Sequence, residues 1–308
     1  MADVIVHKPG MLSTVQDLGR WGYQSVGVPV AGPMDEYSHR LANRLVGNPD
    51  HAATLEVTVI GPDLAFDGEV TFAVAGAEFP LELDGVPVAG NVRCRAASGS
   101  RLRFGVRSRG ARAYLAVAGG LDLPPVMGSR SESVISGVGP LGGRALAAGD
   151  RLPVGGAAAG VAETGRPLAL PDGGARLRIL WGPQADRFTP EARATVVRAR
   201  YTVSPQSNRM GYRLTGDRLS LHGEADILSE ATPMGSVQVP GSGEPILLMA
   251  DRQTAGGYAK IATVIGADLP LAGQLEPGDW IEFTACDLDA ARAARAEAAA
   301  RLHGRGRP

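Results

Sequence analysis

Residues 245–265 read PILLMADRQTAGGYAKIATVI, and this stretch contains the pattern that predicts the fold. Two short apolar runs, 245–250 and 260–265, flank a polar segment that holds two adjacent glycines. Apolar runs of about four to eight residues, bounded by turn-forming residues, are typical of β-strands. We therefore predict two strands joined by a Gly-Gly turn, around which six polar side chains gather: Asp251, Arg252, Gln253, Thr254, Tyr258 and Lys260.

The same pattern recurs along the chain, in VTFAVAG (70–76), AYLAVAGG (113–120) and LRIL (177–180). The 308 residues include 42 glycines and 22 prolines, which indicates many turns. Long amphipathic helices do not follow the strands, so a doubly wound sheet is excluded and a barrel or sandwich is favoured. LAAGDRLPV (146–154) resembles LEPGDWIEF (275–283), which suggests two similar β-rich halves; chance similarity between turn sequences is the alternative.

Three helices are predicted. The first follows Asp35, a good N-cap, and carries Tyr37, Leu41 and Leu45 on one apolar stripe before Gly47 ends it. The second begins at Thr189-Pro190, an N-cap followed by proline at the first helical position. The third spans 287–303; it is rich in alanine and charge, so we expect it to be exposed to solvent.

Residues 155–174, GGAAAGVAETGRPLALPDGG, are mostly small, which is typical of a linker. The predicted organisation is a first β-barrel subdomain at 1–155 and a linker at 156–174. A second β-barrel subdomain follows at 175–286, and a charged helix or tail at 287–308 ends the chain.

Composition excludes several classes of protein. The formal net charge of −1 argues against a nucleic-acid binder, and no segment approaches the roughly 20 apolar residues of a membrane helix. The first residues do not read as a signal peptide, so a cytoplasmic protein is expected. Two distant cysteines and five scattered histidines predict neither a disulfide framework nor a metal site. The lysine motif of biotin attachment is missing, so we expect no biotin on this chain.

Three further stretches gather polar residues. In 13–38, Gln16, Asp17 and Arg20 lie in a glycine-punctuated segment, where the alternative to a site is a turn held by Asp17. Glu56 lies in a strand-like run and needs a partner, which could be Arg20, Arg40 or a ligand.

In 204–216, Asn208 and Arg209 could bind a carboxylate or phosphate, although an ordinary polar loop explains them equally well. For the polar segment after residue 250 we favour a site, because it begins directly at the end of an apolar strand that can aim side chains.

A set of motifs resembles, in the same order along the chain, the motifs of a known family. It includes STVQDLGRWGY, GVPVAGPMD, LEVTVIGP, RILWGPQADRF, SNRMGYRLTG and VQVPGSGEPILLMADRQTAGGY, from about residue 10 to residue 283. Together they resemble the biotin-dependent carboxyltransferase A/B-subdomain family. That family includes the C component of 5-oxoprolinase, allophanate hydrolase subunit 2 and an antagonist of a kinase inhibitor. Ala255 and Ala259 replace the Thr and Pro often seen in QTTGGYP, which leaves the proposed polar groups intact.

The resemblance implies a fold of two cyclophilin-like β-barrel subdomains and a companion subunit that carries the C and D subdomains. It also implies a function as the C component of an ATP-dependent 5-oxoprolinase, which converts 5-oxoproline to glutamate with subunits A and B. The subunit that binds ATP is left open, and the isolated chain is expected to be inactive. One alternative is a carboxyltransferase half-domain acting on carboxybiotin and urea or another amide; another is a non-catalytic regulator that binds a kinase-inhibitor-like partner.

Opening a stable lactam requires cations for anionic oxygens and a carboxylate to manage protons. We predict Asp251, Lys260 and Glu56 as catalytic residues. The predicted substrate-binding residues are Gln16, Asp17, Arg20, Asn208, Arg209, Arg252, Gln253, Thr254 and Tyr258. Side chains from both halves are expected to converge on one cleft suited to a small anionic amide.

Overall fold

The computed structural model describes residues 2–156 and 165–304, which fold into two compact units. Among these residues, unit 1 contains 2–21, 31–156, 165–170 and 299–304, and unit 2 contains 22–30 and 171–298. The division between Leu170 and Pro171 lies inside the predicted linker, of which residues 157–164 fall outside the described part. Each unit is described by itself below.

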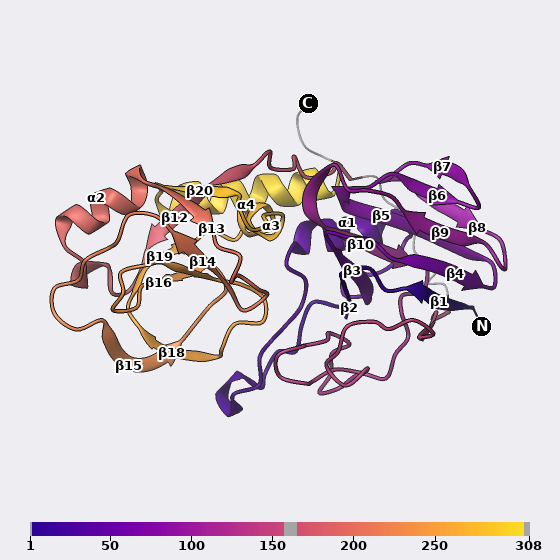
Figure 1. Ribbon diagram of the computed structural model, residues 1–308, viewed down its shortest axis with the longest axis horizontal. Coiled ribbons are helices and arrows are strands. Elements are labelled where there is room, and N and C mark those ends of the chain that lie inside the picture. Colours follow the sequence, from indigo (N-terminus) through magenta and orange to yellow (C-terminus); the bar gives the residue numbers. More distant parts are fainter. Residues whose placement is uncertain (1, 157–164, 305–308) are drawn as a thin grey trace. The chain divides into compact units, whose positions relative to one another are not determined.

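Unit 1 is built from two antiparallel sheets (Figure 1). The six-stranded sheet has the order β11(Arg151–Pro153), β1(Asp3–Lys8), β4(Asp63–Asp67), β9(Arg101–Phe104), β6(Leu81–Leu83), β7(Val86–Val88). The five-stranded sheet has the order β2(Leu12–Gln16), β3(Thr54–Thr58), β10(Arg109–Val117), β5(Val70–Glu78), β8(Cys94–Ala96). The predictions for 70–76 and 113–120 are confirmed as parts of β5 and β10.

Strand alternation divides the side chains of unit 1 between two apolar clusters. Along β5, Phe72 and Val74 join the core shared by both sheets, whereas Ala73 and Ala75 face the first helix, α1(Glu36–Leu45). Successive residues of a strand point to opposite faces, and the small alanines let the helix approach closely. Helix α1 contributes the predicted stripe to this second cluster: Tyr37, Leu41 and Leu45.

The predicted N-cap of α1 is confirmed. The Asp35 carboxylate accepts the Ser38 N–H at 2.9 Å and the Ser38 hydroxyl at 2.6 Å, which satisfies one of the free amides of the first turn. Gly47 has φ 79°, the left-handed conformation expected just beyond a helix end.

Unit 2 contains a closed seven-stranded barrel. Its order is β12(Gly174–Trp181), β19(Lys260–Val264), β16(Ser236–Gln238), β17(Ile246–Leu248), β14(Gly211–Thr215), β13(Arg200–Val203), β20(Trp280–Ala285). The strands predicted at 177–180, 245–250 and 260–265 are confirmed as β12, β17 and β19. The prediction of a mainly β protein with a barrel is thus confirmed, and unit 1 differs in arranging its strands as two sheets.

The predicted Gly-Gly turn is wrong. Gly256 and Gly257 lie in a strand, β18(Ala255–Tyr258), which pairs with β15(Asp226–Ala231) in a separate two-stranded sheet (Figure 1). A Cβ added at Gly256 would lie 2.7 Å from Gln238 Nε2 and 3.0 Å from Thr232 Cγ2. A side chain at this position would have to displace the Gln238 amide, so Gly256 reflects close packing of the strand on these side chains rather than a turn.

The other helices are α2(Pro190–Arg198), α3(Leu269–Gly273) and α4(Leu288–Leu302), with short 3-10 turns η1(Gln24–Val26) and η2(Ala185–Arg187). The predicted cap of α2 is confirmed, since Thr189 Oγ1 accepts the Ala192 N–H at 3.1 Å. The third predicted helix is confirmed as α4, but it is not wholly solvated: Leu302 is 7% exposed and packs in the α1 cluster of unit 1. Among the described residues, no helix has the length and apolarity needed to cross a membrane.

The Gly-Asp turns of the two halves have the same hydrogen bonds. Asp150 accepts the Ala147 N–H at 2.8 Å, and Asp279 accepts the Glu276 N–H at 3.0 Å. The Gly149 N–H donates to the Val6 carbonyl and the Gly278 N–H donates to the Val203 carbonyl, both at 2.8 Å. The resemblance between 146–154 and 275–283 therefore extends from sequence to backbone geometry, and each turn leads into a strand of its own unit.

Candidate functional site

The predicted site residues are divided between the two units. Unit 1 holds Gln16, Asp17, Arg20 and Glu56, and unit 2 holds Asn208, Arg209, Asp251, Arg252, Gln253, Thr254, Tyr258 and Lys260. The expected convergence of both halves on one cleft stays a prediction.

Asp17 organises a loop of unit 1. Its Oδ1 accepts hydrogen bonds from the hydroxyls of Ser129 and Ser131 at 2.6 and 2.7 Å, and from the Gly19 N–H at 2.9 Å. Its Oδ2 accepts the Arg130 N–H at 2.6 Å. Burial by itself would raise the pKa of Asp17, but these four bonds to the ionised form outweigh it and lower the pKa. The carboxylate therefore holds residues 129–131 against the chain segment that follows β2.

Gln16 and Arg20 are fully buried and bind backbone groups. Arg20 donates to the carbonyls of Val126 and Ser131, each at 2.9 Å. Gln16 donates to the Glu132 carbonyl at 2.9 Å and accepts the Gly32 N–H at 3.1 Å. Their geometry fits residues that position loops, because no part of either side chain reaches solvent in this structure.

Glu56 lies beneath the start of α1. Its Oε2 accepts the Met34 N–H at 2.8 Å and the Tyr114 hydroxyl at 2.7 Å, while the Tyr114 oxygen accepts the Asp35 N–H at 2.8 Å. Glu56 is 1% exposed, and Arg40, one of its predicted partners, pairs with Glu36 and Asp50 instead. The Glu56 carboxylate thus anchors the loop that leads into the helix.

In unit 2, Arg209 and Asp251 form a buried ion pair. Nε and Nη2 of Arg209 lie 3.0 Å from Oδ2 and Oδ1 of Asp251, a bidentate arrangement. The side chains are 5% and 0% exposed. Arg209 precedes β14 and Asp251 follows β17, and these strands pair through Gly211 and Leu248. The pairing of neighbouring strand ends therefore brings together two residues that are distant in sequence.

A chain of polar contacts continues from Asp251. Arg252 Nε donates to the Thr232 carbonyl at 2.7 Å, and the Thr232 hydroxyl donates to the Gln253 carbonyl. Gln253 Nε2 donates to Gln238 Oε1 at 3.1 Å. Burial lowers the pKa of Arg252, against the opposing effect of Asp251. The guanidinium still stays charged at neutral pH, because arginine begins so far above it.

A third set of polar contacts, besides the Arg209–Asp251 pair and the contacts of Arg252 and Gln253, surrounds Lys260. Its Nζ contacts Glu230 Oε1 at 2.5 Å, and Gln184 Nε2 donates to the same oxygen at 2.7 Å. Lys260 pairs in register with Gln238, which pairs in turn with Ile246 at the start of β17. Lys260 therefore lies near the start of β17, whereas Asp251 lies beyond its end. The Gln253–Gln238 contact connects the segment that follows Asp251 with the strand that pairs with Lys260.

The remaining predicted residues surround these contacts. Asn208 is exposed, and its Oδ1 accepts the Met210 N–H at 2.8 Å, which fits a turn before β14. The Thr254 carbonyl accepts the Thr232 N–H at 3.2 Å. Tyr258 is 41% exposed at the end of β18, so its ring is available to a ligand or a partner.

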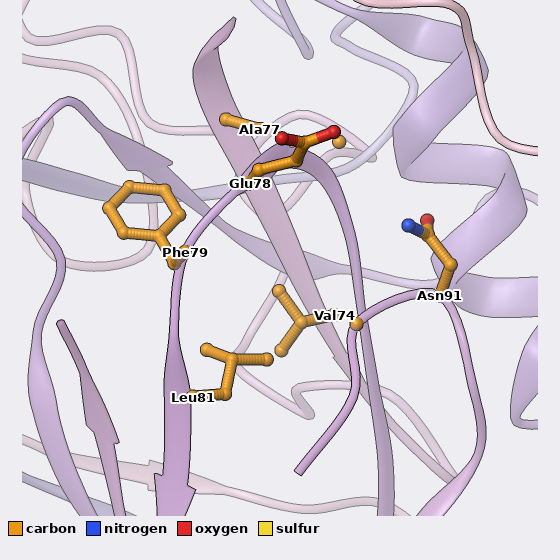
Figure 2. A pocket seen from close by; sticks show the side chains of 8 residues that line it. Val74, Ala77, Glu78, Phe79, Leu81 and Asn91 are labelled. Atoms are coloured by element: carbon orange, nitrogen blue, oxygen red, sulfur yellow. The ribbon is translucent and has the colours of Figure 1, made fainter. Parts of the chain in front are cut away.

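A small pocket in unit 1 lies elsewhere (Figure 2). It has a volume of about 140 Å³ and is lined by β5 residues together with Phe79, Leu81, Gly90 and Asn91. None of the predicted site residues lines it. Within the described part of the chain, no cluster of three His, Cys, Asp or Glu side chains could hold a metal ion.

Residues 26–285 match the family described as carboxyltransferase domain, subdomain A and B. The chain belongs to this carboxyltransferase A/B family. It is similar to the C component of 5-oxoprolinase from Escherichia coli K12, with 41% identity over 94% of this chain and 93% of that protein. The Haemophilus influenzae protein of the same name is 38% identical over 91% of this chain and 90% of its own length. The crystal structure of Kluyveromyces lactis urea amidolyase has a TM-score of 0.93 at 30% identity; the match covers 99% of this chain and 20% of the amidolyase.

Four residues of this A/B-family chain were missed by the sequence analysis: Gln184, Glu230, Thr232 and Gln238. Gln184 lies within RILWGPQADRF, one of the motifs that carry the resemblance, so a signal for it existed. Glu230 lies in DILSEA, where nothing distinguishes it from an ordinary exposed strand residue. Its role depends on the contact of its side chain with Lys260 of β19, which the local sequence does not reveal.

Proposed function

We propose that the chain is the C component of an ATP-dependent 5-oxoprolinase and that it works with subunits A and B to open 5-oxoproline to glutamate. The observation that carries the proposal is the similarity to the E. coli C component, at 41% identity over 93% of that protein. By contrast, the chain corresponds to 20% of the urea amidolyase, most of which has no counterpart here.

The polar groups of unit 2 suit this chemistry. The lactam amide is stabilised by resonance, so attack by water at C5 requires prior activation of its oxygen. If the lactam oxygen attacks the γ-phosphorus of ATP, a C–O–P bond forms and ADP leaves. Water can then add to C5 and the ring nitrogen leaves with a proton, which opens the ring and leaves an acyl phosphate. A second water hydrolyses the acyl phosphate to glutamate and inorganic phosphate.

Each step places negative charge on oxygens that cations can stabilise. Lys260, Arg252 and Arg209 are the candidate cations, and Asp251 is the candidate proton carrier. Asp251 is already bound to Arg209, so proton transfer requires that ion pair to loosen when substrate binds. We propose Glu56, Gln16, Asp17 and Arg20 as residues that position the loops of unit 1, because their observed bonds connect loop segments.

The test is reconstitution. The chain is purified with candidate A and B subunits, and both ATP hydrolysis and glutamate formation are measured with and without 5-oxoproline. We expect ATP hydrolysis to depend on the lactam and on all three subunits. Stable association without lactam-dependent hydrolysis would contradict the proposal.

A second function is favoured by the urea amidolyase similarity, with its TM-score of 0.93. In that case the chain would be half of a carboxyltransferase centre that accepts a carboxyl group from carboxybiotin on another polypeptide. Carboxylation of urea or another amide that requires a biotinylated partner would support this function over lactam opening.

A further inference from the structure

The ion pair between Lys260 and Glu230 is asymmetric in exposure. The Lys260 side chain is 3% exposed, whereas the Glu230 side chain that meets it is 42% exposed. A buried ammonium without a counter-ion is costly, so an anion has to remain beside Lys260. A half-exposed carboxylate, in contrast, returns to water at little cost. Glu230 is therefore the member of the pair that another anion can replace.

Two donors converge on one oxygen of Glu230. The Lys260 Nζ lies 2.5 Å from Glu230 Oε1, and Gln184 Nε2 lies 2.7 Å from it. The Gln184 amide is itself held in place, because its Oε1 accepts the main-chain N–H of Lys260 at 3.1 Å. These hydrogen bonds, with that of Lys260 the larger, lower the pKa of Glu230 and keep it ionised at neutral pH. The protein thus holds a preformed oxyanion position that its own carboxylate occupies.

The donors and the carboxylate come from different parts of unit 2. Lys260 begins barrel strand β19, and Gln184 precedes η2 after barrel strand β12. Glu230 belongs to β15, which is in the separate sheet with β18, and the register of that pair shifts between Asp226 and Glu230. Withdrawal of the Glu230 side chain therefore breaks no hydrogen bond of the barrel ladder.

We propose that Glu230 is a built-in stand-in for the oxyanion of a ligand, and that a carboxylate or phosphoryl group displaces it from Lys260 and Gln184. After the exchange the Lys260 ammonium is still paired with a negative charge, and the Glu230 carboxylate is hydrated. The choice of ligands rests on the proposed function, in which the oxyanion is either the carboxylate of 5-oxoproline or a phosphoryl group of the nucleotide. An attached competitor acts at an effective concentration of about millimolar, so it weakens ligand binding.

Calorimetric titration of the complex with its companion subunits tests the proposal. The probes are 5-oxoproline, inorganic phosphate and 2-pyrrolidinone, which has the same ring without the carboxylate. In Glu230→Gln we expect at least one of the two anions to bind about threefold to fivefold more tightly, the range expected for loss of a partly exposed ion pair. Binding of 2-pyrrolidinone should not change.

The control variants separate competition from damage. Asp226→Asn removes a carboxylate from the same strand and should leave all affinities unchanged. Adding Lys260→Met to Glu230→Gln should abolish the gain. Glu230→Asp keeps a shorter competitor and should give an intermediate affinity, which also tests the proposal if the glutamine variant does not fold.

Each outcome has a distinct meaning. Tighter binding of 5-oxoproline assigns the position to the substrate carboxylate, and tighter binding of phosphate alone assigns it to a phosphoryl group. Equal or weaker binding of both anions in Glu230→Gln overturns the proposal, since a purely structural ion pair predicts that result. If the complex shows no lactam-dependent turnover but phosphate binding still responds, the proposed function fails while the oxyanion position stands.

Discussion

In unit 1 the predicted site residues bind mainly backbone groups, whereas in unit 2 Arg209, Asp251 and Lys260 pair with other charged side chains. Asp17 accepts a hydrogen bond from a loop amide, and Arg20 donates one to a loop carbonyl. Arg209 binds Asp251, and Lys260 binds Glu230. A backbone group cannot leave without unfolding its loop, but a side-chain counter-ion can rotate away. The difference indicates that unit 1 uses its polar residues for architecture and that unit 2 keeps exchangeable charges.

The largest effect is expected at the buried ion pair of unit 2. Asp251→Ala leaves Arg209 buried without its bidentate partner, and we expect a loss of about 3–5 kcal/mol in the free energy of unfolding. Urea-induced unfolding measures the loss. The double variant Arg209→Met with Asp251→Leu should cost less than Asp251→Ala, because it removes both charges. A loss below about 1 kcal/mol for Asp251→Ala would mean that the pair is loose enough to exchange like Lys260 and Glu230.

In unit 1, the buried His39 should make stability depend on pH. Its ring nitrogens contact Thr54 Oγ1 at 2.9 Å and the Asp50 carbonyl at 3.0 Å, and burial lowers its pKa from 6.5 to about 4. Unfolding therefore takes up a proton once the pH falls below 6.5. The stabilisation is complete above that pH and is lost progressively towards pH 4, by up to about 3 kcal/mol.

Unfolding free energies measured between pH 7.5 and 4.5 test this expectation. The comparison of wild type with His39→Gln isolates the histidine, because other groups titrate in both proteins. Parallel pH profiles for the two proteins would show that the pKa of His39 is the same in the folded and unfolded states, so that burial does not lower it.

The anchoring role of Glu56 predicts a smaller loss of stability. Tyr114→Phe removes the hydroxyl that donates to Glu56 and accepts the Asp35 N–H. We expect about 2 kcal/mol of destabilisation, because buried partners are left unsatisfied, with kcat unchanged in the reconstituted complex. A tenfold fall in kcat at full folding would instead place this network in the chemistry and weaken the contrast between the units.

Two of the candidate cations of unit 2 should affect activity. We expect Lys260→Ala and Arg252→Ala each to reduce the activity of the reconstituted complex at least tenfold, equivalent to ~1.4 kcal/mol of barrier. Arg176→Ala is a matched control, since Arg176 pairs with Glu282 on the surface of the same unit. Activities equal to the control in both variants would remove these two cations from the site.

Much of the local structure could be predicted from the sequence, and the site only in part. Asp35 and Thr189 cap helices as expected, and the apolar runs at 70–76 and 260–265 are strands. The prediction of a Gly-Gly turn was wrong, because adjacent glycines before an apolar run occur at turns and also in strands that pack closely on neighbouring side chains. The polar residues after β17 were found from their position at a strand end. Glu230 had no comparable local sign, and Gln184 was marked only by its place in the motif RILWGPQADRF.

By itself, the sequence determined the β-rich class, the starts of α1 and α2 and the family, because caps, periodicity and ordered motifs depend on residues close together along the chain. The tertiary structure alone decided the partners of the charged side chains. Asp251 meets Arg209 through the pairing of β14 with β17, and Glu230 meets Lys260 because a separate two-stranded sheet brings it there. The physical reason is that ion pairs depend on strand register between distant segments, which local sequence preferences do not determine.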